Sequence, residues 1–206
     1  PPKATALHAV KLPARGGDTQ FVNMHEAYKA LPEPMQRRIV GRMARHVYQS
    51  RFSERKLPQP AGERRKTIGT ASVLHPLVRT HPESGRKAIY INPIRVEEIV
   101  GMETGEALAL LDELLAHSTQ PRFEYRHKWR AGDMVIWDNR SVMHQANADY
   151  DPNEYRFLYR IMLQGAPDPR VLQPQLVAAR KAGIPVLVTH FFEESDPMPP
   201  NVTALV

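Results

Sequence analysis

The pattern of apolar and polar positions predicts many short strands and few helices. Apolar and polar residues alternate in residues 4–12 (ATALHAVKL), 123–129 (FEYRHKW) and 155–163 (YRFLYRIML), with the two-residue period of a half-buried strand. Further extended segments are predicted at residues 19–23, 74–80, 87–92, 134–137 and, as an edge strand, 186–190. Such a series of short strands with one main helical excursion indicates a sandwich or barrel of the jelly-roll kind.

Helical spacing is found in three stretches. In residues 24–48 apolar side chains recur at every fourth position, and Pro32 and Pro34 divide this stretch into two predicted helices. A second stretch, residues 104–117, has a threonine at its start as the predicted N-cap. A short amphipathic helix is predicted at residues 171–183.

The length of 206 residues fits one domain, and we interpret residues 1–206 as a single mainly β (α+β) domain with helical insertions. Residues 53–70 are polar and without periodicity, which predicts a mobile loop, and residues 171–206 form a predicted C-terminal extension. No apolar run approaches the roughly 20 residues that a membrane span needs, so no membrane partner is expected.

The composition limits the chemistry that the chain can carry. Cysteine is absent, which excludes disulfides, thiolate metal sites and a cysteine nucleophile, so any metal must be held by His, Asp or Glu. The net charge is +6, but aromatic residues make up only 7% and are not interleaved with the cations as a base-stacking surface requires. Nucleic acid is therefore not the expected partner. The one candidate site for binding nucleic acid is the basic stretch Arg55 to Lys66, for which a solvated basic loop is the alternative interpretation.

Three short motifs could carry chemistry, and each has an ordinary structural alternative. Residues 16–19 (GGDT) place a hydroxyl at a strand start, although the same residues make a plain turn. Residues 137–144 (WDNRSVMH) lead from a buried strand to a histidine, although a lone histidine is more often structural. Arg156 and Arg160 share one face of a predicted strand, where they either meet carboxylates or face solvent at a sheet edge.

The order and spacing of these motifs resemble the taurine dioxygenase family of Fe(II)- and 2-oxoglutarate-dependent oxygenases. Between the GGDT motif and the WDNR motif lie residues 75–86 (HPLVRTHPESGR) and 88–92 (AIYIN), and the resemblance extends from residue 1 to about residue 165. It implies a double-stranded β-helix (jelly roll), N-terminally incomplete as given, that uses Fe(II), 2-oxoglutarate and O2. The implied reaction is hydroxylation of a small organic substrate, with release of succinate and CO2.

The resemblance assigns roles to four residues of these three motifs. His144 matches the distal histidine of an iron site made of two histidines and one carboxylate. Thr19 and Arg156 match the residues that hold the distal carboxylate of 2-oxoglutarate, a task suited to a hydroxyl and a guanidinium. Arg160 matches a second arginine near the iron and the co-substrate, which helps to hold the substrate's anionic group and so takes part in catalysis.

Two further residues are candidates for the substrate pocket. Phe52 falls where the family has a pocket phenylalanine. Arg95 lies in a segment where the family usually has an aromatic residue, and it either adds a cation to the pocket or lies on the surface. We expect a small anionic substrate such as a sulfonate, taurine or an alkylsulfate.

The iron site is the point at which the chain departs from the family. The proximal His-x-Asp pair does not occur in the sequence, the resemblance places it before Pro1, and His81-Pro82-Glu83 is a poor substitute. The alternative interpretation is therefore a non-catalytic jelly-roll protein that binds 2-oxoglutarate and lacks a complete iron site. For the enzyme, we expect a cytoplasmic location and a homo-oligomer.

Overall fold

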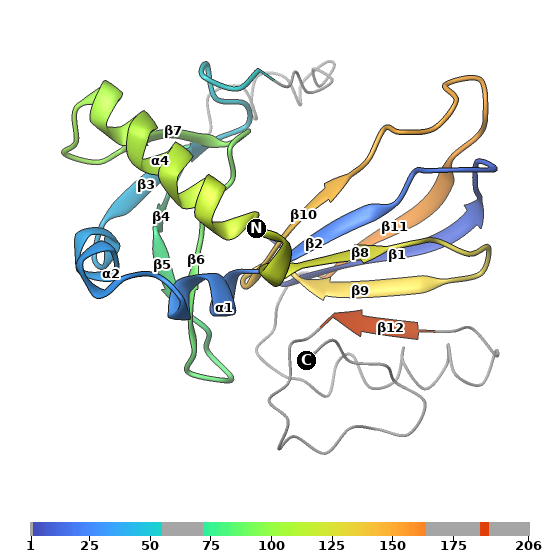
Figure 1. The fold of residues 1–206 in the computed structure, drawn as a ribbon, viewed down its shortest axis with the longest axis horizontal. Coiled ribbons are helices and arrows are strands. Elements are labelled where there is room, and N and C mark those ends of the chain that lie inside the picture. The colour runs from blue at the N-terminus through green and yellow to red at the C-terminus, as the bar shows by residue number, and fades with distance from the viewer. Residues whose placement is uncertain (1, 55–71, 164–185, 190–206) are drawn as a thin grey trace. The chain divides into compact units, whose positions relative to one another are not determined.

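A computed structural model describes residues 2–54, 72–163 and 186–189 of the chain (Figure 1). Contacts divide the chain into two compact units: unit 1 is Pro1–Val22 with Glu124–Val206, and unit 2 is Asn23–Phe123. Each unit is described by itself. Most of the predicted loop 53–70 and of the predicted extension 171–206, including its helix, lies outside the described residues, and the single-domain organisation stays a prediction.

Unit 1 is built from two sheets that form two layers in Figure 1. One sheet has the strand order β11-β1-β9-β12 and the other the order β10-β2-β8. Strand β1 lies antiparallel to both β9 and β11, and β12 pairs with β9 in parallel. The strands are β1 (Ala4–Lys11), β2 (Thr19–Asn23), β8 (Glu124–His127), β9 (Met134–Asp138), β10 (Val142–Ala146), β11 (Phe157–Leu163) and β12 (Val186–Thr189). This arrangement agrees with the predicted sandwich.

A small aromatic and aliphatic core joins the two sheets of unit 1. Phe21 of β2, Val135 and Trp137 of β9, and Val142 of β10 form one buried cluster, in which the rings of Phe21 and Trp137 meet edge to face at 5.3 Å. Burying each such side chain contributes about 1.5–3 kcal/mol. Because Thr19 and Phe21 are two positions apart on β2 and both are buried, the strand directs Thr19 to the same face as the core ring.

Unit 2 combines short strands with helices. Its strands form a sheet of order β4-β3-β7 and a hairpin of β5 and β6. The elements are α1 (Met24–Lys29), α2 (Glu33–Ile39), β3 (Met43–Val47), β4 (Ser72–Pro76), β5 (Val78–Thr80), β6 (Lys87–Ile89), β7 (Val96–Ile99), α4 (Thr104–Ser118) and the 3-10 helix η1 (Pro121–Phe123). Helix α4 buries Ala107, Leu110 and Leu114, whose spacing places them on one helical face. Among the helices of the described residues, none is long and apolar enough to cross a membrane.

Three local predictions were wrong, each for a physical reason. The predicted second helix within residues 24–48 ends at Ile39, and its last part forms β3, because Gly41 adopts φ 80°, which a right-handed helix cannot continue. A spacing of four is also a multiple of the strand period of two, so the apolar pattern fitted both structures. The N-cap of α4 is Glu103, whose carboxylate accepts the N–H groups of Gly105 and Glu106. The segments now seen as β7 and β10 were not predicted as strands, since four or five residues show too little periodicity.

One histidine of β3 should make the stability of unit 2 depend on pH. The ring of His46 lies 5.0 Å from that of His75 and 5.7 Å from that of Tyr90. Burial, followed by the charges of His75 and Arg95, lowers the pKa of His46 from 6.5 to about 4. The native imidazole therefore stays neutral in a range where the imidazole of the unfolded chain takes up a proton.

We predict that the free energy of unfolding decreases as the pH falls from about 6.5 through about 4. In this range the unfolded state binds more protons than the native state, so acidification favours unfolding. Urea unfolding of the wild type and of His46→Gln at a series of pH values measures the effect, and the variant should show the shallower slope. Equal slopes would contradict the assignment to His46.

Candidate functional site

Arg156 links the two sheets of unit 1 at one end. It directly precedes β11, and its Nε donates to the carbonyl oxygen of Gly17 at 2.8 Å. Its Nη2 donates to Oγ1 of Thr19 at 3.4 Å, and Thr19 is only 1% exposed. The structure thus brings together Thr19 and Arg156, which lie far apart in the sequence.

The two glycines of the GGDT motif make this approach possible. Gly16 and Gly17 have φ values of 72° and 71°, which L side chains rarely adopt. A Cβ on Gly17 would lie 3.1 Å from Cδ and Nε of Arg156, and a Cβ on Gly16 would lie 2.3 Å from the carbonyl oxygen of Asp149. The motif is therefore more than a plain turn, because it admits the backbone to close contact with an arginine.

The carboxylates beside the GGDT motif are paired with a different arginine. Arg126 on β8 donates from Nε to Asp18 Oδ2 at 2.8 Å and from Nη2 to Asp149 Oδ2 at 2.5 Å. The other oxygen of Asp149 accepts the backbone N–H of Gly17 at 2.8 Å. The Gly17 hydrogen bond, together with Arg126, lowers the pKa of Asp149, and the hydrogen bond to Asp18 raises the pKa of Arg126. Asp149 is thus held as a carboxylate, and both acidic side chains contact Arg126.

Arg156, by contrast, is a partly buried cation without an ion pair among the described residues. Burial lowers the pKa of its guanidinium below the usual value. Its two hydrogen bonds leave other N–H donors of the planar fork unused, and such a fork matches a carboxylate in a bidentate manner. Because a desolvated cation is costly unless it meets an anion, this site fits a carboxylate ligand.

One contact to Thr19 was missed in the sequence. Trp129 donates from its indole Nε1 to Oγ1 of Thr19 at 3.0 Å. The residue ends a segment that the alternation marked as a strand, so the sequence indicated its approximate position. Which polar group its N–H would reach depends on the pairing of β8 with β2, which joins residues far apart in the chain.

His144 lies on β10 with its ring against the core of unit 1. The ring is stacked on that of Phe21 at 6.3 Å and is tilted against that of Trp137 at 4.6 Å, and the residue is exposed. Within the described residues, the imidazole belongs to no group of three His, Asp or Glu ligands. Since an iron site of this kind needs three such ligands, His144 by itself does not make one, and its role as a ligand stays a prediction.

The remainder of the WDNR motif forms the turn between β9 and β10. Asp138 Oδ1 accepts both the backbone N–H and Nε of Arg140 at 2.8 Å. Asn139 donates from Nδ2 to Oγ1 of Thr5 on β1 at 2.9 Å. These contacts fix the turn to the sheet. Because β10 follows directly, the turn also determines the position of His144 on that strand.

Arg160 points to the same side of its sheet as the core. In the antiparallel register it lies opposite Leu7, which packs against the core cluster, so the two side chains share the inner face. Arg160 is nevertheless exposed, and its strand β11 is the outer strand of the sheet within the described residues. The structure therefore places Arg160 on the inner face of an edge strand, and its predicted role stays a prediction.

Phe52 and Arg95 belong to unit 2 and are not placed relative to the residues above. Phe52 is 37% exposed, and the guanidinium of Arg51 lies over its ring at 4.6 Å. Arg95 donates from Nη1 to the carbonyl oxygen of Tyr48 at 2.6 Å and lies over the Tyr48 ring at 5.1 Å. Their predicted place in a substrate pocket stays a prediction.

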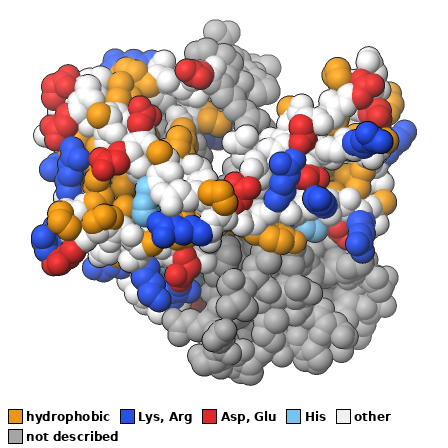
Figure 2. All heavy atoms as spheres, viewed as in Figure 1, with side chains coloured by type: hydrophobic (Ala, Val, Ile, Leu, Met, Phe, Trp, Pro, Cys, Tyr) orange, Lys and Arg blue, Asp and Glu red, His pale blue; other side chains and the backbone are white. Residues whose placement is uncertain are grey.

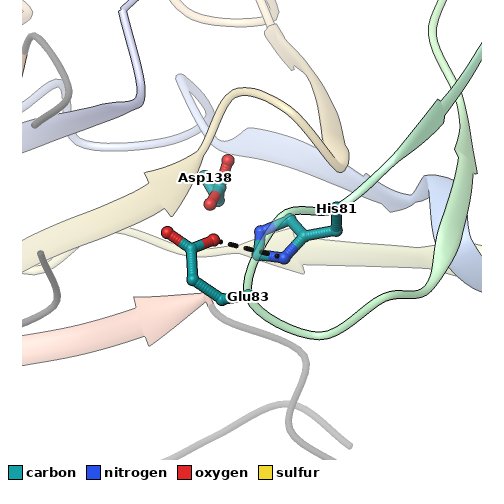
Figure 3. A group of neighbouring side chains, drawn as sticks. All are labelled: His81, Glu83 and Asp138. Carbon is teal, nitrogen blue, oxygen red and sulfur yellow. Dashed lines mark ion pairs between the residues drawn. The ribbon is translucent and has the colours of Figure 1, made fainter. Parts of the chain in front are cut away.

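The His81-Pro82-Glu83 segment forms a turn of unit 2. His81 is buried, and its Nδ1 lies 3.3 Å from Oε2 of Glu83 (Figure 3). The backbone N–H of Ser84 also donates to this Nδ1, at 3.2 Å, so the ring nitrogen has a role in the turn itself. Asp138, drawn in the same figure, is a residue of unit 1 whose contacts with Arg140 are given above.

Charges of both signs are mixed on the face of the molecule that Figure 2 shows. On the face shown in Figure 2, Lys and Arg side chains alternate with Asp and Glu and do not gather in one basic patch. Several are paired within unit 2, for example Arg45 with Glu98 at 2.8 Å and Arg51 with Glu97 at 3.0 Å. The basic stretch Arg55 to Lys66 lies outside the described residues.

Comparison with known proteins decides the family. The model of the family described as "Taurine catabolism dioxygenase TauD, TfdA family" matches residues 1–162. The chain belongs to this family. The resemblance that the motifs indicated is thereby confirmed.

Characterised relatives carry dioxygenase names. The chain is 41% identical over 160 residues to the alpha-ketoglutarate-dependent 2,4-dichlorophenoxyacetate dioxygenase of Burkholderia sp. (strain RASC), covering 77% of this chain and 52% of the relative. It is 36% identical over 169 residues to the alpha-ketoglutarate-dependent sulfate ester dioxygenase of Pseudomonas putida, covering 80% and 56%. The chain therefore spans about half the length of these relatives. Alpha-ketoglutarate is the older name of 2-oxoglutarate.

Solved structures confirm the jelly-roll fold class. A taurine dioxygenase from Burkholderia xenovorans superimposes with a TM-score of 0.68 at 36% identity, over 81% of this chain and 53% of that one. The structure of AAD-2 in complex with Mn(II) and N-oxalylglycine superimposes with a TM-score of 0.70 at 33% identity, over 81% and 64%.

The close contact at Gly16 leads to a stability prediction. Gly16→Ala should lower the free energy of unfolding by more than about 3 kcal/mol, because it adds a backbone clash to the strain of a positive φ. Gly132→Ala is the matched control: its φ is 91°, but nothing lies within 4 Å of the added Cβ, so only about 1–2 kcal/mol is expected. Urea unfolding of both variants measures the difference, and equal losses would show that the approach of Asp149 is unimportant.

Proposed function

We propose that this chain carries the co-substrate site and one iron ligand of an Fe(II)- and 2-oxoglutarate-dependent dioxygenase. The observation that supports this most directly is the partly buried guanidinium of Arg156, which lies beside the Thr19 hydroxyl and forms no ion pair among the described residues. A dicarboxylate such as 2-oxoglutarate supplies the anion that this cation requires. Family membership adds the dioxygenase chemistry that the relatives' names describe.

In this proposal Arg156 and Thr19 bind the distal carboxylate of 2-oxoglutarate, and His144 is a ligand of the iron. The rings of Phe21 and Trp137 hold the His144 imidazole against the core, which limits its rotation. When bound, the iron supplies the reaction with O2 that converts 2-oxoglutarate to succinate and CO2 and hydroxylates the substrate. The residues of the chain bind and orient the reactants.

The proposed substrate is a small organic anion, of the sulfonate, taurine or alkylsulfate kind. Arg160 supports this, because it presents a guanidinium on the inner face of β11 and forms no ion pair among the described residues. The names of the two relatives above also denote acids or their esters, 2,4-dichlorophenoxyacetate and sulfate esters. Phe52 and Arg95 are further candidates for the substrate pocket, and we propose a homo-oligomer in the cytoplasm.

The role of Arg156 predicts a selective loss of binding. Arg156→Ala should weaken binding of 2-oxoglutarate by about 10- to 100-fold, since a charge-assisted hydrogen bond contributes about 1.5–3 kcal/mol. Binding of 2-oxoglutaramate, whose distal end is a neutral amide, should change far less. Calorimetric titration with both compounds measures the ratio, with Arg130→Ala, an exposed arginine at the nearby turn, as the control. An unchanged preference for the dicarboxylate would refute the role.

The role of His144 predicts a loss of iron-dependent turnover. In the full-length protein, His144→Ala should abolish consumption of 2-oxoglutarate with ferrous iron, because one imidazole ligand is lost, while the Arg156 site remains intact. Succinate formation in the presence and absence of ferrous iron measures this. Turnover undiminished in the variant would contradict the assignment. A full-length wild-type protein that binds 2-oxoglutarate and never consumes it would favour the non-catalytic alternative.

A further inference from the structure

We infer that Trp129 is a positioning residue for the co-substrate: its indole N–H orients the Thr19 hydroxyl so that the hydroxyl proton is donated to the distal carboxylate. The inference rests on the proposed function, because it assumes that a carboxylate binds at Arg156. It adds Trp129 to the residues proposed for the co-substrate site, as an uncharged side chain that acts through Thr19.

The argument begins with the hydrogen bonds of the Thr19 hydroxyl. A hydroxyl has one proton to donate and two lone pairs to accept with. Oγ1 accepts from Trp129 Nε1 at 3.0 Å and from Arg156 Nη2 at 3.4 Å, so both lone pairs are used. No acceptor for the hydroxyl proton is found among the described residues, although Thr19 is only 1% exposed. The proton is therefore available to a ligand beside Arg156.

The indole is suited to this task because it can only donate. A side chain that both donates and accepts, such as glutamine, could take the Thr19 proton and turn the hydroxyl away from the ligand. Indole Nε1–H has no acceptor function, so it compels Oγ1 to accept. With both lone pairs of Oγ1 engaged by donors, the hydroxyl can only donate to the ligand, as Arg156 does, and this favours an anion over a neutral ligand.

The indole itself is held by its neighbours. The ring of His127 meets the ring of Trp129 at 4.6 Å and almost perpendicularly. His127 Nε2 lies 3.2 Å from Asp133 Oδ2, and the same carboxylate oxygen accepts the backbone N–H of Arg130 at 2.8 Å. Burial lowers the pKa of His127, although Asp133 opposes the effect. The turn after β8 thus fixes the imidazole that supports the indole, and a fixed donor reduces the ordering that ligand binding requires.

A purely structural role is the competing explanation. Trp129 also packs against the core cluster of Phe21, Val135, Trp137 and Val142. Trp129→Phe separates the two roles, because it keeps an aromatic ring at the position and removes the N–H. A structural role alone would change the stability and leave the ligand preference as it was.

The test is a double-mutant cycle read by ligand binding. The full chain, with zinc(II) as a diamagnetic substitute for iron, is titrated calorimetrically with 2-oxoglutarate and with 2-oxoglutaramate. Trp129→Phe should bind 2-oxoglutarate about five- to tenfold more weakly, the value of one hydrogen bond, and should discriminate less against the amide. Thr19→Val should lose at least as much, and adding Trp129→Phe to it should cause no further loss. Thr19→Ser, which keeps the hydroxyl, should retain the affinity.

A second measurement follows the Trp129 indole of the wild type directly. The chain contains two tryptophans, so a ¹⁵N-labelled sample has two indole N–H signals, and the spectrum of Trp129→Phe assigns them. Addition of 2-oxoglutarate to the wild type should shift the Trp129 signal, because the hydrogen bond to Thr19 strengthens when the hydroxyl donates to a carboxylate.

The outcomes distinguish the inference from the proposed function. If the wild type binds 2-oxoglutarate and Trp129→Phe binds it equally well, or if the two substitutions are additive, the inference is wrong and the proposed function stands. If the Trp129 signal does not move at saturating 2-oxoglutarate, the inference is also wrong. If the wild type does not bind 2-oxoglutarate at all, both fail.

Discussion

The guanidinium of Arg156 imposes the main constraint on unit 1. It is partly buried at the end of the sandwich, and the two nearest acidic residues of the GGDT region are bound to Arg126. Within the described residues its partners are therefore neutral oxygens, those of Gly17 and Thr19. A cation held in this way favours an anionic ligand, because the ligand relieves a desolvation cost that the neighbouring groups of the protein offset only in part.

Strand β2 connects this site with the predicted iron ligand. Its first residue, Thr19, contributes the hydroxyl, and Phe21 two positions later stacks on the ring of His144. The two-residue period of a strand places both side chains on the inner face. A change in the core around Phe21 and Trp137 would therefore affect the orientation of both the Thr19 hydroxyl and the His144 ring.

Local patterns were most reliable where the alternation of apolar and polar residues was long. Strand β2 has the predicted bounds, and β1 and β11 lie within the predicted segments. The pattern failed for β3, where a spacing of four fits a helix and a strand equally, and Gly41 decided between them through its positive φ. It also failed for short strands such as β10, which are stabilised by their neighbours more than by their own residues.

The sequence by itself determined the family and the sandwich class, because the motifs and strand patterns are local and can be read in order. It also indicated Thr19, His144, Arg156 and Arg160 as candidates through the resemblance. Only the tertiary structure decided which of them meet. The contact between Arg156 and the GGDT motif joins positions 139 residues apart, and that between Trp129 and Thr19 joins positions 110 apart. Such contacts depend on strand pairing and on free space at a glycine, which no local pattern records.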